Sequence, residues 1–180
     1  MYRKLSLLLT IHALNLSLVN AQSNNATTSI VGEIILPDNS RLTGNIKDNI
    51  RKKGEVILES NGEKKKFKAS EVTSVQLGQR KFLSINYTFY EVLSTGNNGT
   101  ILRKANEPSG VQYNGNDAFV ISSPGKIDDL FIQPRGGAQV VHITKKNANE
   151  VLASLCPGRV SSEVTVFDAG YVQTQLNNCK

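Results

Sequence analysis

Hydrophobic and polar residues alternate along much of the chain, and the clearest stretch predicts a β-hairpin over residues 30–46. Its apolar residues fall on one face at spacings of two or four: Ile30, Ile34 and Leu36 on the first arm, Leu42 and Ile46 on the second. The turn at 37–40 contains residue types that preset φ or bond to their own backbone. Gly32 and Gly44 share the apolar face, which predicts close packing or a strong bend there rather than a binding cleft.

Similar β-type runs predict more strands, bounded by Gly, Pro and Asn, over residues 54–60, 64–69, 72–77, 82–87, 89–94, 100–104, 118–121, 129–132 and 138–143. Asn61-Gly62 is a strong hairpin signal between two of these runs. We expect a short turn at Ser70-Glu71. Residues 47–53 are predicted to be a polar connector. Residues 106–117 are predicted to be a long loop, because Pro, Gly and Asn crowd there.

The hydrophobic period becomes helical near the C-terminus. One helix is predicted after Asn147, which resembles the first residue of a capping box with Glu150, and it ends at Pro157-Gly158. A second helix is predicted from Asp168, with Ala169, Val172, Leu176 and Cys179 on one face. The predicted fold class is mainly β (α+β): an antiparallel β-meander, sandwich or partly open barrel of eight to ten strands, followed by two short helices.

Cys156 and Cys179 are the only cysteines, and each ends one of the predicted helices. A redox pair or metal site would favour C-x-x-C spacing or accompanying histidines, and neither is present. We therefore predict a structural disulfide that joins the two helices. In the chain-entropy model it would stabilise the fold by about 3 kcal/mol.

The N-terminus resembles a cleaved secretory signal, with Arg3 and Lys4 before an apolar run and Ala21 at its end. The run is shorter than the roughly 20 apolar residues of a membrane span. We predict a signal peptide over 1–21, a flexible leader over 22–29, a β-rich domain over 30–143 and a helical segment over 144–180 on the same domain. The expected location is secreted, periplasmic or at the cell surface.

Loss of Arg3 and Lys4 with the predicted signal lowers the formal charge from +6 to +4, and this mild basicity favours anionic surroundings, whereas export argues against nucleic acid. Basic residues cluster in two places: Arg51, Lys52, Lys53, Lys64, Lys65, Lys66 and Lys68. The lysine-rich strand is typical of a solvated sheet edge, and we favour that interpretation. The alternative is a patch for an anionic envelope polymer or another envelope protein.

Residues for catalysis are sparse. His142 is the one histidine after the predicted signal, and no Gly-x-Ser-x-Gly elbow, phosphate-binding loop or metal-ligand spacing is present. The chain also has no tryptophan on which sugars could stack. We therefore predict a non-enzymatic binding or scaffolding module at the cell envelope, without a cofactor or metal. The alternative is a small secreted hydrolase that uses His142 with a distant carboxylate.

Three short motifs resemble a known group of proteins. They are Gly32-x-Ile34-x-Leu36 with Leu42-x-Gly44-x-Ile46, a Phe82…Leu93-x-x-Gly96 block, and Cys156-Pro157 with the terminal Asn178-Cys179. With them the chain resembles the uncharacterised secreted β-rich proteins of the Bacteroidota. The resemblance implies a β-rich domain that ends in helices, located in the envelope or outside the cell. It implies no catalytic residues.

Overall fold

A computed structural model describes residues 29–107, 111–114, 117–120, 125–137, 139–157 and 164–179. The predicted signal peptide lies outside the described residues, as does the predicted leader except for Ser29, with which the first strand begins. The elements are β1 (Ser29–Ile35), β2 (Arg41–Asn49), α1 (Ile50–Lys53), β3 (Glu55–Ser60), β4 (Glu63–Lys68), the 3₁₀ turn η1 (Ala69–Glu71), β5 (Ser74–Leu77), β6 (Arg80–Ile85), β7 (Thr88–Gly96), β8 (Gly99–Lys104), β9 (Val111–Asn114), β10 (Asp117–Val120), β11 (Leu130–Pro134), β12 (Val141–Ile143), α2 (Ala148–Leu155) and α3 (Ala169–Asn177).

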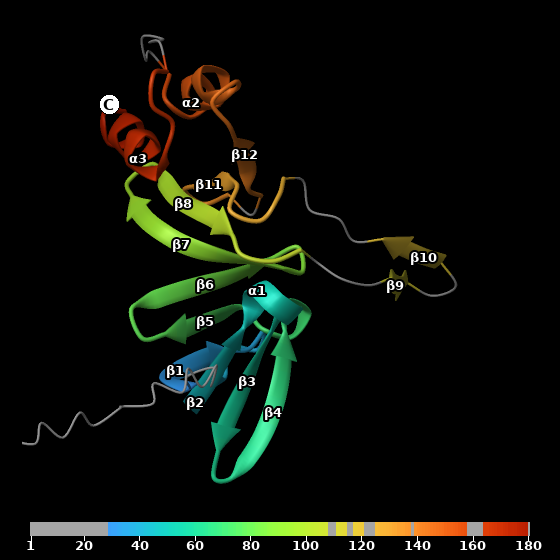
Figure 1. Ribbon diagram of the computed structural model, residues 1–180. Helices are drawn as coiled ribbons and strands as arrows, with labels where there is room; N and C mark the ends of the chain where they lie inside the picture. The colour runs from blue at the N-terminus through green and yellow to red at the C-terminus, as the bar shows by residue number, and fades with distance from the viewer. Residues whose placement is uncertain are drawn as a thin grey trace, which may run out of the picture.

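Ten strands form one open antiparallel sheet in the order β12-β11-β8-β7-β6-β5-β1-β2-β3-β4 (Figure 1). Most neighbours in the sheet are also neighbours in the chain, as in a meander. Two pairings skip intervening strands: β1 pairs with β5 as well as β2, and β11 pairs with β8. The predicted mainly β fold is confirmed, and β4 and β12 are the two edges.

The hydrophobic core divides along the sheet. At the β4 end, a single cluster contains Phe67 of β4 and Phe89 of β7, together with buried residues from β1, β2, β3, β5 and β6. Because strands that are far apart in the sheet share this cluster, this end of the sheet is rolled over its own side chains. At the β12 end, α2 and α3 pack over Ile101 and Ile132.

Gly32 and Gly44 make this rolling possible. They lie opposite one another in the β1–β2 register, on the face that carries Ile34 and Ile46. A Cβ atom at Gly44 would lie 2.6 Å from the Glu59 carbonyl oxygen, and one at Gly32 would collide with the Gln76 carbonyl oxygen. The predicted close packing at these glycines is confirmed.

The C-terminal helices are joined by the predicted disulfide between Cys156 and Cys179, which are 23 residues apart. The predicted start of the second helix at Asp168 is confirmed: Asp168 is the N-cap of α3, and its carboxylate accepts from the Tyr171 amide. Asn147 is the N-cap residue of α2, as its predicted cap position requires, but its side chain makes no capping hydrogen bond and the predicted capping box is not formed. Its side chain instead accepts from the Thr144 amide and donates to the His142 carbonyl oxygen, which ties the start of α2 back to β12.

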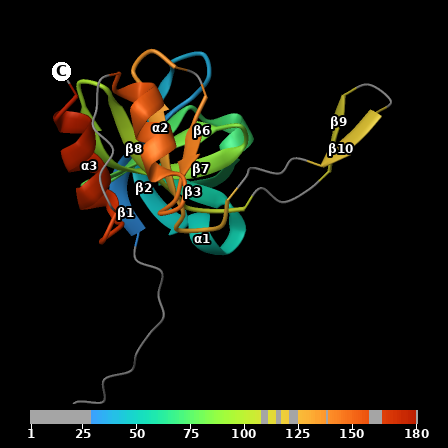
Figure 2. The ribbon, with the colours of Figure 1, turned by 90° about the horizontal axis from the view of Figure 1, so that it is seen from above.

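Two predicted loops contain regular structure. The polar connector over 47–53 is the end of β2 followed by α1, because Ile50 is fully buried and Gly54 ends the helix with φ +63°. The predicted loop over 106–117 includes β9, which pairs with β10 in a separate hairpin. Figures 1 and 2 show this hairpin standing away from the main sheet. None of the helices in the described ranges is long and apolar enough to cross a membrane.

Candidate functional site

A chain of alternating charges crosses the middle of the sheet between the two cores. Glu91 accepts hydrogen bonds from Arg80 (2.8 Å) and from Arg103 (2.5 Å). Arg80 also donates to Asp48 at 3.1 Å, and Arg51 of α1 makes a bidentate contact with Asp128. Arg103 Nε also lies 4.0 Å from Asp128 Oδ1, which links the two groups of contacts. Together they join α1, strands β2, β6, β7 and β8 and the segment before β11, so we call this set the charge brace.

Glu91 is the centre of the charge brace. Its side chain is only 11% exposed. Burial alone would raise the pKa of this carboxyl, but the hydrogen bonds from Arg103 and Arg80 outweigh it and the pKa lies below its ordinary value. The hydrogen bond from Arg51 likewise lowers the pKa of Asp128. Every charge in the brace is therefore compensated, which is typical of a structural network.

The four predicted lysines of β4 lie along one edge of the sheet. Lys64, Lys66 and Lys68 alternate on the outer side of β4, and all are exposed. Lys65 points to the other side, with its Nζ 5.1 Å from the centre of the Phe67 ring. The expected edge position of this strand is confirmed.

The structure brings only part of the predicted basic patch together. Lys68 lies opposite Glu55, the residue that begins β3 directly after Gly54, so it is close to α1 with Lys52 and Lys53. Lys64 lies at the far end of β4 and contacts Glu59 at 3.5 Å. Arg51 is engaged with Asp128. We call the lysines of α1 and of the outer side of β4 the lysine surface: Lys52, Lys53, Lys64, Lys66 and Lys68.

His142 lies in β12 as predicted, and it has an acidic neighbour that the sequence did not indicate. Its Nε2 is 3.0 Å from Asp129 Oδ2, although the two atoms are not aligned for a hydrogen bond, and its ring stacks on Phe131. The same Asp129 oxygen accepts from the Lys126 amide at 2.7 Å. No hydroxyl or thiol hydrogen-bonds to the imidazole among the described residues.

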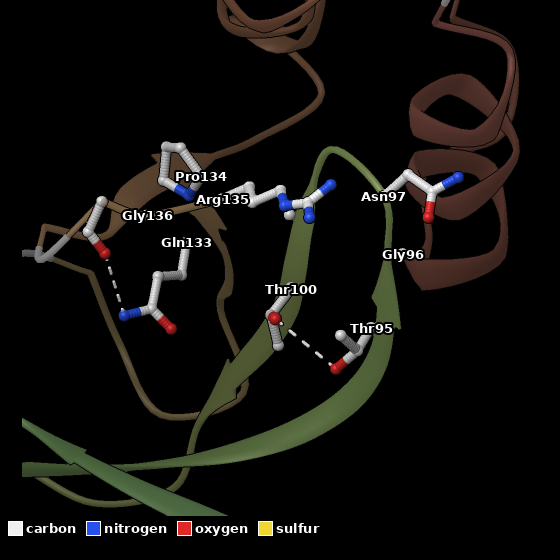
Figure 3. A pocket seen from close by; sticks show the side chains of 10 residues that line it. Thr95, Gly96, Asn97, Thr100, Gln133, Pro134, Arg135 and Gly136 are labelled. Atoms are coloured by element: carbon white, nitrogen blue, oxygen red, sulfur yellow. Dashed lines mark hydrogen bonds between the residues drawn. The ribbon is translucent and has the colours of Figure 1, made fainter.

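A polar cleft of about 680 Å³ lies at the ends of β7, β8 and β11 (Figure 3). Thr95 pairs with Thr100, and Thr100 pairs with Gln133, so these three side chains form a row across neighbouring strands. The row lies on the face opposite Ile101 and Ile132, which pack against the helices. Arg135 and Asn97 complete the cleft from the adjoining turns. We call this site the threonine cleft.

The sequence could not indicate the threonine cleft, because its members come from three separate strands and their pairing was unknown. A second depression, of about 500 Å³, lies between the sheet and the start of α3. Its lining mixes apolar and charged residues, among them Leu93, Leu130, Ile143, Phe167, Arg103 and Lys145. In the parts of the chain that the structure describes, no group of three or more His, Cys, Asp or Glu side chains could hold a metal ion.

Comparison with known proteins gives no relative for this chain. No protein-family model, no curated protein and no solved structure matches it.

Proposed function

We propose that this chain is an exported, non-enzymatic β-domain that binds an anionic polymer of the cell envelope through the lysine surface. The observation that carries the proposal is the alternation of exposed Lys64, Lys66 and Lys68 on a strand at the sheet edge, with Lys52 and Lys53 beside its end. Export to the envelope rests on the signal-like N-terminus.

The charge balance of the lysine surface supports this proposal. Two carboxylates face β4 across the β3–β4 pair, Glu59 opposite Lys64 and Glu55 opposite Lys68. Five lysines against two carboxylates leave an excess of positive charge. Successive lysines on one side of a strand are about 7 Å apart. A linear polyanion lying along β4 could therefore contact several of them at once, and such binding weakens as salt screens the charges.

Charge reversal of the outer lysines tests this function. We expect the K64E/K66E/K68E variant to bind dextran sulfate more than about tenfold less tightly than the parent, because each lysine contributes on the order of 1 kcal/mol at an anionic surface. Binding is measured by calorimetry at low and high salt, and the parent affinity should fall as salt rises.

The control variant for this test reverses two lysines that lie outside the lysine surface. Reversal of Lys145 and Lys146, exposed residues before α2, should leave most of the affinity intact. Neutral dextran should not bind. Equal losses in both sets of variants would mean that only net charge matters and would refute a specific surface on β4.

A secreted hydrolase remains the second candidate function, and the contact between His142 and Asp129 favours it. A carboxylate beside an imidazole can orient it as a general base. If this candidate is correct, the parent will cleave at least one member of a panel of chromogenic esters and glycosides. His142→Ala should then lower that rate at least about a hundredfold. Activity that survives the substitution would rule out this role for His142.

A further inference from the structure

We propose that the threonine cleft binds an acidic sugar unit, a hydroxyl-rich ring that carries one carboxylate. The cleft is separate from the lysine surface: it lies on β7, β8 and β11, whereas β4 is the edge at the other end of the sheet (Figure 1). The threonine cleft is thus a second binding site, in addition to the lysine surface of the proposed function, and its ligand is an acidic sugar.

The row of polar side chains suits a ligand with several hydroxyl groups. Thr95, Thr100 and Gln133 follow one another at the strand spacing of about 4.8 Å. The row next to it on the same face is apolar and consists of Val92, Leu102 and Phe131. Hydroxyl and amide groups both donate and accept hydrogen bonds, as sugar hydroxyls do. Recognition here would depend on hydrogen bonds, so the lack of tryptophan is no obstacle.

Arg135 provides the charge recognition. It is the one charged residue among those that line the cleft, and it is exposed. Throughout the described ranges, no carboxylate forms an ion pair with Arg135, unlike Arg51, Arg80 and Arg103 in the charge brace. A guanidinium can bind a carboxylate through two parallel hydrogen bonds. Figure 3 shows its side chain reaching across the cleft toward Asn97.

The cleft is held in shape by contacts of its own. The Gly137 amide donates to the Pro134 carbonyl oxygen at 2.9 Å, which closes a β-turn with Gly136 at φ +73°. The Gln133 side chain donates to the Gly137 carbonyl oxygen at 3.2 Å. Asn98 connects this turn to α3: its carbonyl oxygen accepts from the Arg135 amide, and its side chain donates to the Leu176 carbonyl oxygen. The backbone of the cleft is therefore fixed before a ligand binds, and ordering is needed mainly for the exposed Arg135 side chain.

The test measures binding of trimers of galacturonate, glucuronate and mannuronate to the full chain by calorimetry. We expect at least one to bind the parent. Arg135→Ala should weaken that binding by roughly ten- to a hundredfold, and Arg135→Lys by a smaller factor because a lysine cannot make the bidentate contact. Thr100→Val, which keeps the shape and the β preference, should weaken binding by about three- to tenfold.

Controls separate this site from charge effects and from the lysine surface. Lys146→Ala removes one positive charge outside the cleft and should not change trimer binding. K64E/K66E/K68E should also bind the trimer with the parent's affinity. The test of the threonine cleft is therefore independent of whether the lysine surface binds a polyanion. The methyl ester of the bound trimer should bind at least tenfold more weakly than the acid.

Three outcomes would overturn the inference. One is that none of the three trimers binds the parent. Another is that binding is insensitive to Arg135→Ala or equal for the methyl ester. The last is that inorganic phosphate binds as tightly as the trimer and displaces it, which would make the cleft a simple anion site.

Discussion

Gly32→Ala is expected to destabilise the protein by about 3 kcal/mol or more, a large part of the roughly 5–15 kcal/mol by which folded domains are stable. The added methyl group would collide with the Gln76 carbonyl oxygen and would lie 2.9 Å from Ile46 Cδ1. The side chain of Ile46 could rotate away, but the carbonyl belongs to β5, which pairs with β1 at this point. Relief of the collision would therefore separate β1 from β5.

The measurement is chemical denaturation followed by circular dichroism. Val31→Ala is the matched control, because Val31 directly precedes Gly32 on the same strand and its side chain is 75% exposed. It should change the free energy of unfolding by less than about 1 kcal/mol. Gly44→Ala should resemble Gly32→Ala, since its Cβ would meet the Glu59 carbonyl oxygen and Leu58. A Gly32→Ala protein as stable as the control would show that the sheet is less tightly rolled than described.

Glu91→Gln is expected to lower the free energy of unfolding at neutral pH by about 2 kcal/mol. Loss of one member of a fully buried ion pair costs roughly 3–5 kcal/mol, and the cost is smaller here because water reaches Arg80 and Arg103. The matched control is Glu33→Gln. Glu33 also pairs with an arginine, Arg41, but on the exposed surface, where a pair contributes about 0–1 kcal/mol.

The pH dependence of the difference in stability between the parent and Glu91→Gln tests the contribution of the Glu91 charge. The folded state lowers the pKa of Glu91 below its ordinary value of 4.5, so the stabilisation is complete above that pH. It is lost as the pH falls through the lower, folded-state pKa. The difference in stability between the parent and Glu91→Gln should therefore be constant from pH 7 to about pH 5 and shrink toward pH 3. A difference that persists in acid would mean that the glutamine variant is destabilised by poor packing rather than by lost charge.

Local patterns were sufficient to predict most of the elements. The alternation of Ile34 with polar neighbours, the Asn61-Gly62 turn and the helical spacing of Val151, Leu152 and Leu155 each depend on adjacent residues, and each corresponds to an element of the structure. The disulfide could be predicted because only one pairing was available. The lysines of β4 indicated a sheet edge for the same local reason.

Features that depend on distant partners could not be predicted. Nothing in the β1 or β5 sequence specifies that Ile34 pairs with Val75. The sequence places Arg51 with its basic neighbours, because the acid that binds it, Asp128, is 77 residues away. Asn147 is the N-cap of α2, but its side chain bonds to Thr144 and His142 instead of forming the predicted capping box.

The chain leaves the main sheet for the β9–β10 hairpin after Lys104 and returns to it at Asp128 and Asp129, which are hydrogen-bonded to Lys104. The Lys104 amide donates to the Asp129 carbonyl oxygen, and the Asp128 amide donates to the Lys104 carbonyl oxygen. Lys104 Nζ also donates to the Gly125 carbonyl oxygen at 2.6 Å. Strand β8 is therefore hydrogen-bonded directly to β11, and the β9–β10 hairpin lies outside this pairing. Since doubling the length of a flexible loop costs only about 0.6 kcal/mol, we expect the protein to tolerate added or exchanged sequence at this position without loss of its architecture.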